Sequence, residues 1–109
     1  MARTKQVPEF QVQVDGRTYV WWLQRRPAWS RDDNAMTGMA LAARDAEGQR
    51  EVVLEFPPGP RPRLGAPVLK PESIPVRLVT TAIASAIAAG WDPLSRGKPV
   101  MIIVDAEGR

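Results

Sequence analysis

Hydrophobic and polar residues alternate along the first half of the chain in a pattern typical of β-strands with one buried face. The segment Phe10-Gln-Val-Gln-Val14 alternates strictly, and Asp15-Gly16 after it is a strong signal for a two-residue hairpin turn. A second strand over 17–25 then pairs with the first. This register predicts a core-facing side made of Val12, Val14, Tyr19, Trp21 and Leu23. The opposite side then carries Gln11, Gln13, Thr18, Val20 and Trp22.

Two further strands are predicted before the chain becomes rich in proline. Residues 26–34 are polar apart from Trp29, and we interpret them as a loop. A third strand over 36–44 is rich in small residues, and Asp45-Ala-Glu-Gly48 supplies the next turn. Apolar residues alternate again over 51–56. Together these segments predict a four-stranded antiparallel meander.

A proline-rich connection and one helix follow the meander. Seven of the nineteen residues in 57–75 are proline, which excludes a central strand or a helix there. A helix is expected to begin near Pro75, with Ser73 or Glu72 serving its free N–H groups, and to end at Gly90. Its apolar residues recur at helical spacing and form the stripe expected to pack on the sheet: Val76, Leu78, Val79, Ala82, Ile83, Ala86 and Ile87.

The final strand over 100–104 is continuously apolar, and we interpret it as an inner strand with both faces covered. The element order is therefore β-β-β-β-α-β, an α+β fold with one helix packed on one sheet. Residues 1–8 are expected to form a flexible arm. Residues 9–109 then make a single domain that contains the proline-rich connection 57–75.

The segment between the helix and the final strand reads Gly90-Trp91-Asp92-Pro93 and then Arg96-Gly97-Lys98-Pro99. It resembles the C-terminal end of small uncharacterised bacterial proteins, in which a helix ends in Gly-Trp-x-Pro and a Gly-Lys-Pro turn leads into a last apolar strand. The resemblance implies a small α+β bacterial protein without an assigned role, and it assigns no catalytic or ligand residues. From the residues themselves we expect a structural junction in which Trp91 fills the space between helix and sheet. Asp92, Arg96 and Lys98 are a secondary candidate for a partner or ligand surface.

The composition of the 109 residues limits the chemistry available, because the chain contains neither Cys nor His. Disulfides, thiolate nucleophiles, the Ser-His-Asp triad and metal sites built from Cys or His are therefore excluded. An enzyme would have to rely on carboxylates, Lys, Tyr or Ser alone. We therefore expect no enzymatic activity, no cofactor and no metal.

An aromatic and basic cluster is the first candidate for a functional surface. Its members are Trp22, Arg25, Arg26, Trp29 and Arg31. Trp and Arg are enriched at protein interfaces, so we expect a protein-interaction module of an adaptor or immunity-like kind. The alternative is a nucleic-acid-associated protein, since the same residue types stack on bases beside phosphate contacts. The net charge of +3 is spread along the chain and favours a protein partner, and Trp22 packed under the proline-rich segment is a further alternative.

The location and assembly of the protein also follow from the sequence as expectations. No apolar run reaches the length of a membrane span, and the first residues lack the apolar core of a signal peptide, which predicts a cytoplasmic protein without membrane contact. Either edge of the sheet can pair with a second copy, since Lys or Pro residues that would block pairing are scarce along the first strand. Residues 2–6 (Ala-Arg-Thr-Lys-Gln) resemble the start of a core histone tail. The match stops at Val7, and we interpret it as a coincidence.

Overall fold

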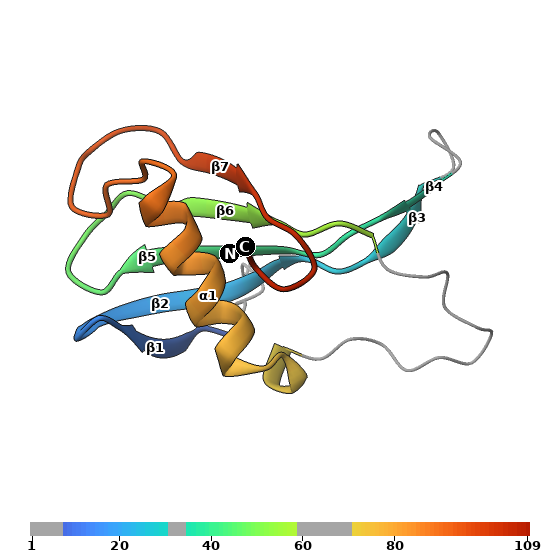
Figure 1. Cartoon of the computed structure of the whole chain (residues 1–109), viewed down its shortest axis with the longest axis horizontal. Helices are drawn as coiled ribbons and strands as arrows, with labels where there is room; N and C mark the ends of the chain where they lie inside the picture. The colour runs from blue at the N-terminus through green and yellow to red at the C-terminus, as the bar shows by residue number, and fades with distance from the viewer. Residues whose placement is uncertain (1–7, 31–34, 59–70) are drawn as a thin grey trace, which may run out of the picture.

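One helix crosses one face of a five-stranded sheet whose strand order is β1-β2-β5-β6-β7 (Figure 1). The computed structural model describes residues 8–30, 35–58 and 71–109. The sheet strands are β1 (Phe10–Val14), β2 (Arg17–Arg25), β5 (Ala40–Asp45), β6 (Val52–Glu55) and β7 (Val100–Ile103). The first four pair antiparallel in the order of the chain, and β7 pairs parallel to β6 after the helix. The predicted α+β fold with its meander, helix and final strand is confirmed.

The first hairpin has the register that its alternation predicts. Val14 pairs with Arg17 and Val12 pairs with Tyr19. Asp15 and Gly16 both have positive φ angles, 51° and 80°, as a two-residue hairpin turn requires. The five predicted core residues of this hairpin are all buried and belong to one cluster under the helix: Val12, Val14, Tyr19, Trp21 and Leu23.

Beyond the ends of β2 and β5 the chain continues as a second, two-stranded hairpin, here called the β3–β4 arm. This arm consists of β3 (Ala28–Ser30) paired antiparallel with β4 (Ala35–Thr37), and it projects beyond one end of the sheet (Figure 1). The prediction of a plain loop over 26–34 is therefore wrong at 28–30, which form β3. The predicted strand over 36–44 is interrupted at Gly38 and Met39. The regular pairing of β2 with β5 breaks at a β-bulge just before the arm. Leu23 pairs with Leu41 whereas Arg25 pairs with Ala40, which leaves Gln24 as the extra residue.

Helix α1 (Val76–Ala88) follows a short 3-10 turn over Pro71–Ser73 and ends where the sequence predicts. Gly90 has a φ of +115°, its N–H bonds to the Ile87 carbonyl, and the Trp91 N–H bonds to the Ala86 carbonyl. These two bonds form a Schellman cap, which needs a left-handed residue at the position of Gly90. The helix begins next to Pro75, as predicted, but Pro75 itself is the N-cap residue and no side-chain hydrogen bond caps the helix start.

The buried stripe of α1 is narrower than its apolar residues suggested. The helical residues that are buried are Val79, Ala82, Ile83 and Ala86. Val76 is 62% exposed and Ile87 is 37% exposed, so these two do not belong to the packed stripe. Val76 is the first residue of the helix and Ile87 is next to its last, so both lie outside the buried stretch 79–86.

β7 lies at the edge of the sheet and not inside it, which corrects the prediction of an inner strand. Val100 and Ile102 are partly buried against the core, whereas Met101 is 63% exposed and Ile103 is 81% exposed. An apolar residue at every position hides the alternation, so the sequence alone does not show that one face of this strand is uncovered.

Asp45 is the buried charged side chain of the described residues. Arg17 Nε donates to Asp45 Oδ2 at 2.8 Å, and the Glu47 backbone N–H donates to Oδ1 at 2.8 Å. The hydrogen bond from Arg17 holds the pKa of the Asp45 carboxyl below its ordinary value of 3.8. Asp45 thereby closes the turn between β5 and β6 and stabilises the fold in its ionised form.

We expect Asp45→Asn to lower the free energy of unfolding at neutral pH by about 1 kcal/mol, since a half-exposed arginine partner limits the strength of the pair. The pKa of Asp45 is lowered on folding, so the carboxylate stabilises the protein above about pH 4 and loses this effect as pH falls through the folded-state pKa. The difference between wild type and variant should therefore shrink below about pH 4. Urea unfolding of both proteins across this range measures the difference, and a constant difference would contradict the assignment.

Candidate functional site

The side of the sheet opposite α1, here called the helix-free face, carries an apolar row that crosses four strands. Trp22 pairs with Ala42, Ala42 pairs with Val53, and Val53 pairs with Met101. Paired residues point to the same side of a sheet, so these four side chains lie next to one another. None of the four belongs to the core cluster under the helix.

The exposure of this row is greatest at the edge strand β7. Ala42 is fully buried between its larger neighbours, Trp22 and Val53 are half-buried, and Met101 is 63% exposed. Ile103, at 81% exposed, extends the apolar surface along β7. The helix lies on the other face of the sheet (Figure 1). Large apolar side chains exposed side by side are typical of an interaction surface.

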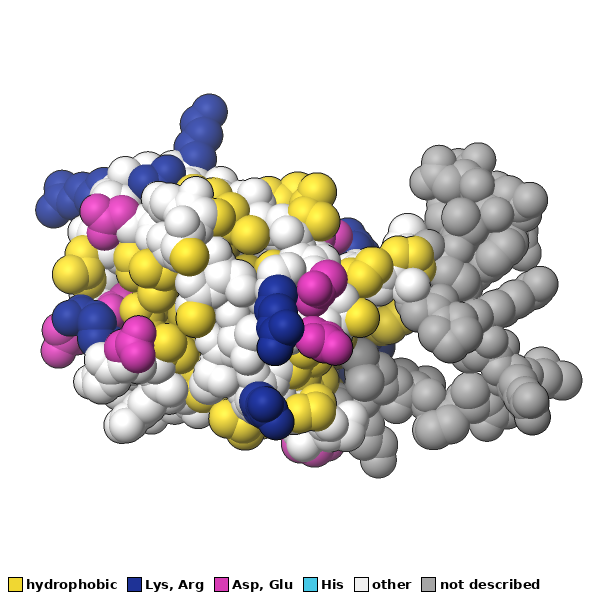
Figure 2. Space-filling model, viewed as in Figure 1, with side chains coloured by type: hydrophobic (Ala, Val, Ile, Leu, Met, Phe, Trp, Pro, Cys, Tyr) yellow, Lys and Arg dark blue, Asp and Glu magenta, His cyan; other side chains and the backbone are white. Residues whose placement is uncertain are grey.

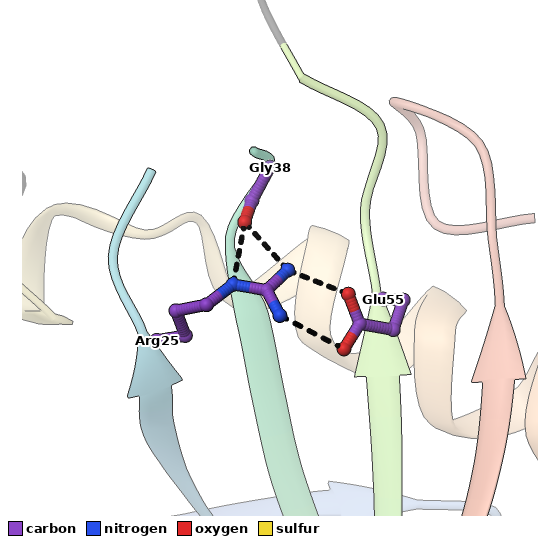
Figure 3. Close-up of polar contacts among 3 residues, drawn as sticks. All are labelled: Arg25, Gly38 and Glu55. Carbon is purple, nitrogen blue, oxygen red and sulfur yellow. Dashed lines mark hydrogen bonds and ion pairs between the residues drawn. The ribbon is translucent and has the colours of Figure 1, made fainter. Parts of the chain in front are cut away.

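A second row beside the first contains the ion pair of Arg25 and Glu55. Arg25 pairs with Ala40, Ala40 pairs with Glu55, and Glu55 pairs with Ile103. Arg25 Nη2 donates to Glu55 Oε1 at 2.6 Å and Nη1 donates to Oε2 at 3.3 Å (Figure 3). The strand register places the small Ala40 between these two residues, so the ion pair spans it. The bulge at Gln24 makes this possible, because it places Arg25 in register with Ala40.

Arg25 also fixes the start of the β3–β4 arm. Its Nε and Nη2 atoms both donate to the Gly38 carbonyl, at 3.1 and 2.8 Å, as Figure 3 shows. Gly38 lies between β4 and β5, where the arm leaves the sheet. The guanidinium of Arg25 therefore has a structural role, and its charge is offset by the Glu55 carboxylate.

The structure describes the predicted aromatic and basic cluster only in part. Trp22 lies on the face that its parity predicts, and Arg26 is exposed. Arg25 belongs to the ion pair with Glu55 and does not present a free guanidinium. Trp29 lies in β3, where the structure describes the backbone but not this side chain. Arg31 lies outside the described residues. The packing of Trp22 against the proline-rich segment also falls on residues beyond the described ranges.

The segment after the helix is a structural junction, as its residues predict. Trp91 is 2% exposed and its ring lies 6.0 Å from the ring of Tyr19. Asp92 Oδ1 accepts a hydrogen bond from the Leu94 N–H at 3.1 Å, so this carboxylate builds the turn. Arg50 holds the same segment by donating to Ser95 Oγ at 2.8 Å and to the Lys98 carbonyl at 3.3 Å.

Of the three secondary candidate residues, two have side chains without a polar contact to any described residue. Arg96 and Lys98 are exposed and directly precede β7, whereas Asp92 is committed to its turn. The structure thus separates the secondary candidate into a structural carboxylate and two cations beside the edge strand.

Val53, Met101 and Ile103 are the residues of the helix-free face that sequence reasoning missed. Val53 faces away from the core by parity with Val52 and Leu54, and this signal was present in the sequence. For Met101 and Ile103 no such signal exists, because β7 is apolar throughout. Their exposure follows only from the edge position of β7.

The charges around the molecule do not concentrate into one basic region on the side that Figure 2 shows. On this helix-bearing side, Lys and Arg side chains are interspersed with Asp and Glu. On the helix-free face, Arg44 is half-buried beside Val20 and has no ion pair with any described carboxylate. Within the described ranges no three Asp, Glu, His or Cys residues gather closely enough to hold a metal ion.

No protein-family model, no curated protein and no solved structure matches this chain. Within the described ranges, no helix has the length and hydropathy needed to cross a membrane.

Proposed function

We propose that this chain is a non-enzymatic protein-interaction module, of an adaptor or immunity-like kind, that binds its partner through the helix-free face. The observation that supports the proposal most strongly is the apolar row from Trp22 to Met101, which continues onto the exposed Ile103. Burying an exposed aliphatic side chain stabilises a complex by about 1.5–3 kcal/mol, so a few such residues supply a specific interface.

The polar residues around the row define the chemistry of the partner. Arg44 lies on the same face without a described carboxylate partner, whereas the charge of Arg25 is offset by Glu55. Glu51 alternates with the buried Val52 and so lies on the same face as Val53, half-buried and without an ion pair to any described cation. Charges of both signs therefore flank the apolar row, and a protein surface with an apolar centre and a mixed charged rim complements this arrangement.

A protein partner is favoured over nucleic acid by the state of Arg25. A phosphate contact requires free guanidinium N–H groups, and four of the five N–H groups of Arg25 donate to Glu55 or to the Gly38 carbonyl. The net charge of +3 also predicts a weak attraction to the nucleic-acid backbone.

Affinity capture with matched variants tests the proposal. The tagged full chain, Val53→Lys and Ala84→Lys are expressed in cells that naturally contain the protein, and each is captured at physiological salt. Val53→Lys places a charge in the apolar row, whereas Ala84→Lys adds the same charge to an exposed position of α1. Circular dichroism confirms that both variants are folded.

We expect one protein to be recovered in stoichiometric amount with wild type and with Ala84→Lys. Recovery with Val53→Lys should fall at least about tenfold, because an unpaired charge would be buried in the interface. Equal recovery with folded Val53→Lys would refute this surface. Capture of nucleic acid alone, released by moderate salt, would refute the protein-partner assignment and support the nucleic-acid alternative.

A further inference from the structure

The outer edge of β7 presents backbone groups that have no hydrogen-bond partner among the described residues. The Val100 N–H bonds to the Glu51 carbonyl at 3.1 Å and the Val104 N–H bonds to the Glu55 carbonyl at 2.9 Å. Backbone groups alternate in direction along a strand, so the N–H and C=O groups of Met101 and Ile103 point away from β6. Neither residue has a backbone hydrogen bond to any described loop or turn.

This edge lacks the features that usually prevent strands from pairing. β7 contains no charged residue and no proline, and its outward-facing residues also carry the exposed side chains of Met101 and Ile103. An uncharged edge with free backbone groups and exposed apolar side chains is suited to accept another strand.

Charges of opposite sign border the two ends of the strand. The exposed cations Arg96 and Lys98 precede β7, and the exposed carboxylates Asp105 and Glu107 follow it. The carboxylate of Asp105 accepts hydrogen bonds from the backbone N–H groups of Glu107 and Arg109, at 2.8 and 3.0 Å, and these bonds hold it next to the end of the strand.

We propose that two copies of this chain pair antiparallel through β7, around a two-fold axis at Ile102. An antiparallel arrangement brings the Lys98 end of each strand beside the Asp105 end of the other, whereas a parallel one would place cations beside cations. The axis at Ile102 follows from the backbone, because it pairs the outward-facing Met101 with the outward-facing Ile103 of the second copy. Each such pair then exchanges its two backbone hydrogen bonds.

This pairing goes beyond the proposed function, since it concerns the edge of the sheet and not the partner bound on its face. It joins the helix-free faces of the two copies into one surface, in which Met101 and Ile103 of both copies are adjacent. A strand of four residues buries less area than a permanent dimer needs. The dimer is therefore expected to dissociate on dilution.

Sedimentation equilibrium of the purified full chain over about a hundredfold range of concentration tests the pairing. We expect the mass to rise from the 12.0 kDa of one chain toward twice that value. Ile103→Pro removes an outward N–H without removing a bond to β6, and it should abolish the rise. The matched control is Gln13→Pro, whose N–H faces outward on the opposite edge strand, β1, and which should leave the dimer intact.

A charge exchange tests the antiparallel arrangement separately. Lys98→Glu and Glu107→Lys should each weaken the dimer about threefold, and the double variant should recover most of the loss. A wild-type chain that stays monomeric over the whole range would overturn the proposal, as would a dimer lost with Gln13→Pro but kept with Ile103→Pro. If the chain is monomeric while Val53 still controls partner capture, the pairing alone fails and the proposed function stands.

Discussion

Gly38→Ala is expected to lower the free energy of unfolding by about 3 kcal/mol, the upper part of the range for overpacked sites. A Cβ atom on Gly38 would overlap the Phe56 carbonyl oxygen and would lie 2.7 Å from the Pro57 carbonyl carbon. Both neighbours are backbone atoms, so a rotamer change cannot relieve the contact. The backbone would have to separate where the arm leaves the sheet. Urea denaturation of the variant measures the loss.

Gly16→Asn is the matched control for the steric argument at Gly38. Gly16 has a φ of +80°, and no atom lies within 4 Å of a Cβ built there. Asparagine tolerates this left-handed conformation, so the control should cost less than about 1 kcal/mol. Equal losses for the two variants would mean that backbone conformation, and not the contact with Phe56, determines the effect. In that case the packing described at the base of the arm would be wrong.

Trp91→Ala is expected to cost about 4 kcal/mol, because the substitution empties the space between the helix end and the sheet. Trp91 is among the largest fully buried side chains and lies against Tyr19. Its Nε1 atom is buried and has no hydrogen-bond partner among the described residues. Loss of that N–H alone should therefore cost little, and Trp91→Phe should lose less than half as much stability as Trp91→Ala. Thermal and urea unfolding of both variants distinguish ring volume from hydrogen bonding. A Phe variant as unstable as the Ala variant would contradict this explanation.

Much of the fold follows from local patterns in the sequence. The first hairpin was predicted residue by residue, because strict alternation and Asp15-Gly16 fix both register and facing. The helix end was predicted for a similar reason, since Gly90 supplies the left-handed position that the cap requires. In these cases the signal and the structure that it specifies lie within a few residues of each other.

Features that depend on distant contacts were not predicted. The bulge at Gln24 depends on the pairing of β2 with β5, and no local signal marks it. The edge position of β7 depends on which strand of the sheet it joins after the helix, and its uniform apolar sequence suits an inner strand equally well. Which apolar residues of α1 are buried depends in the same way on how the helix lies on the sheet.

The sequence predicted one residue of the candidate surface, Trp22, and the other residues of the row are known only from the fold. Parity along β2 places Trp22 away from the core, as expected. The sequence grouped Trp22 with arginines near it in the chain, whereas the sheet places it in a row with Val53 and Met101, which are distant in the chain. Cross-strand neighbours are set by register over the whole sheet, and this is why the group was not visible beforehand.

Photocrosslinking from the helix-free face tests the central claim most directly. A p-benzoylphenylalanine residue replaces Trp22, an aromatic position of the apolar row, and a second protein carries it at Ala84 on the exposed side of α1. Both are irradiated in cells that naturally contain the protein, and the adducts are identified by mass spectrometry. We predict a single protein adduct of discrete mass from position 22 and none from position 84. An adduct from position 84 alone, or crosslinks from position 22 to nucleic acid only, would contradict the assignment of the helix-free face as a protein-binding surface.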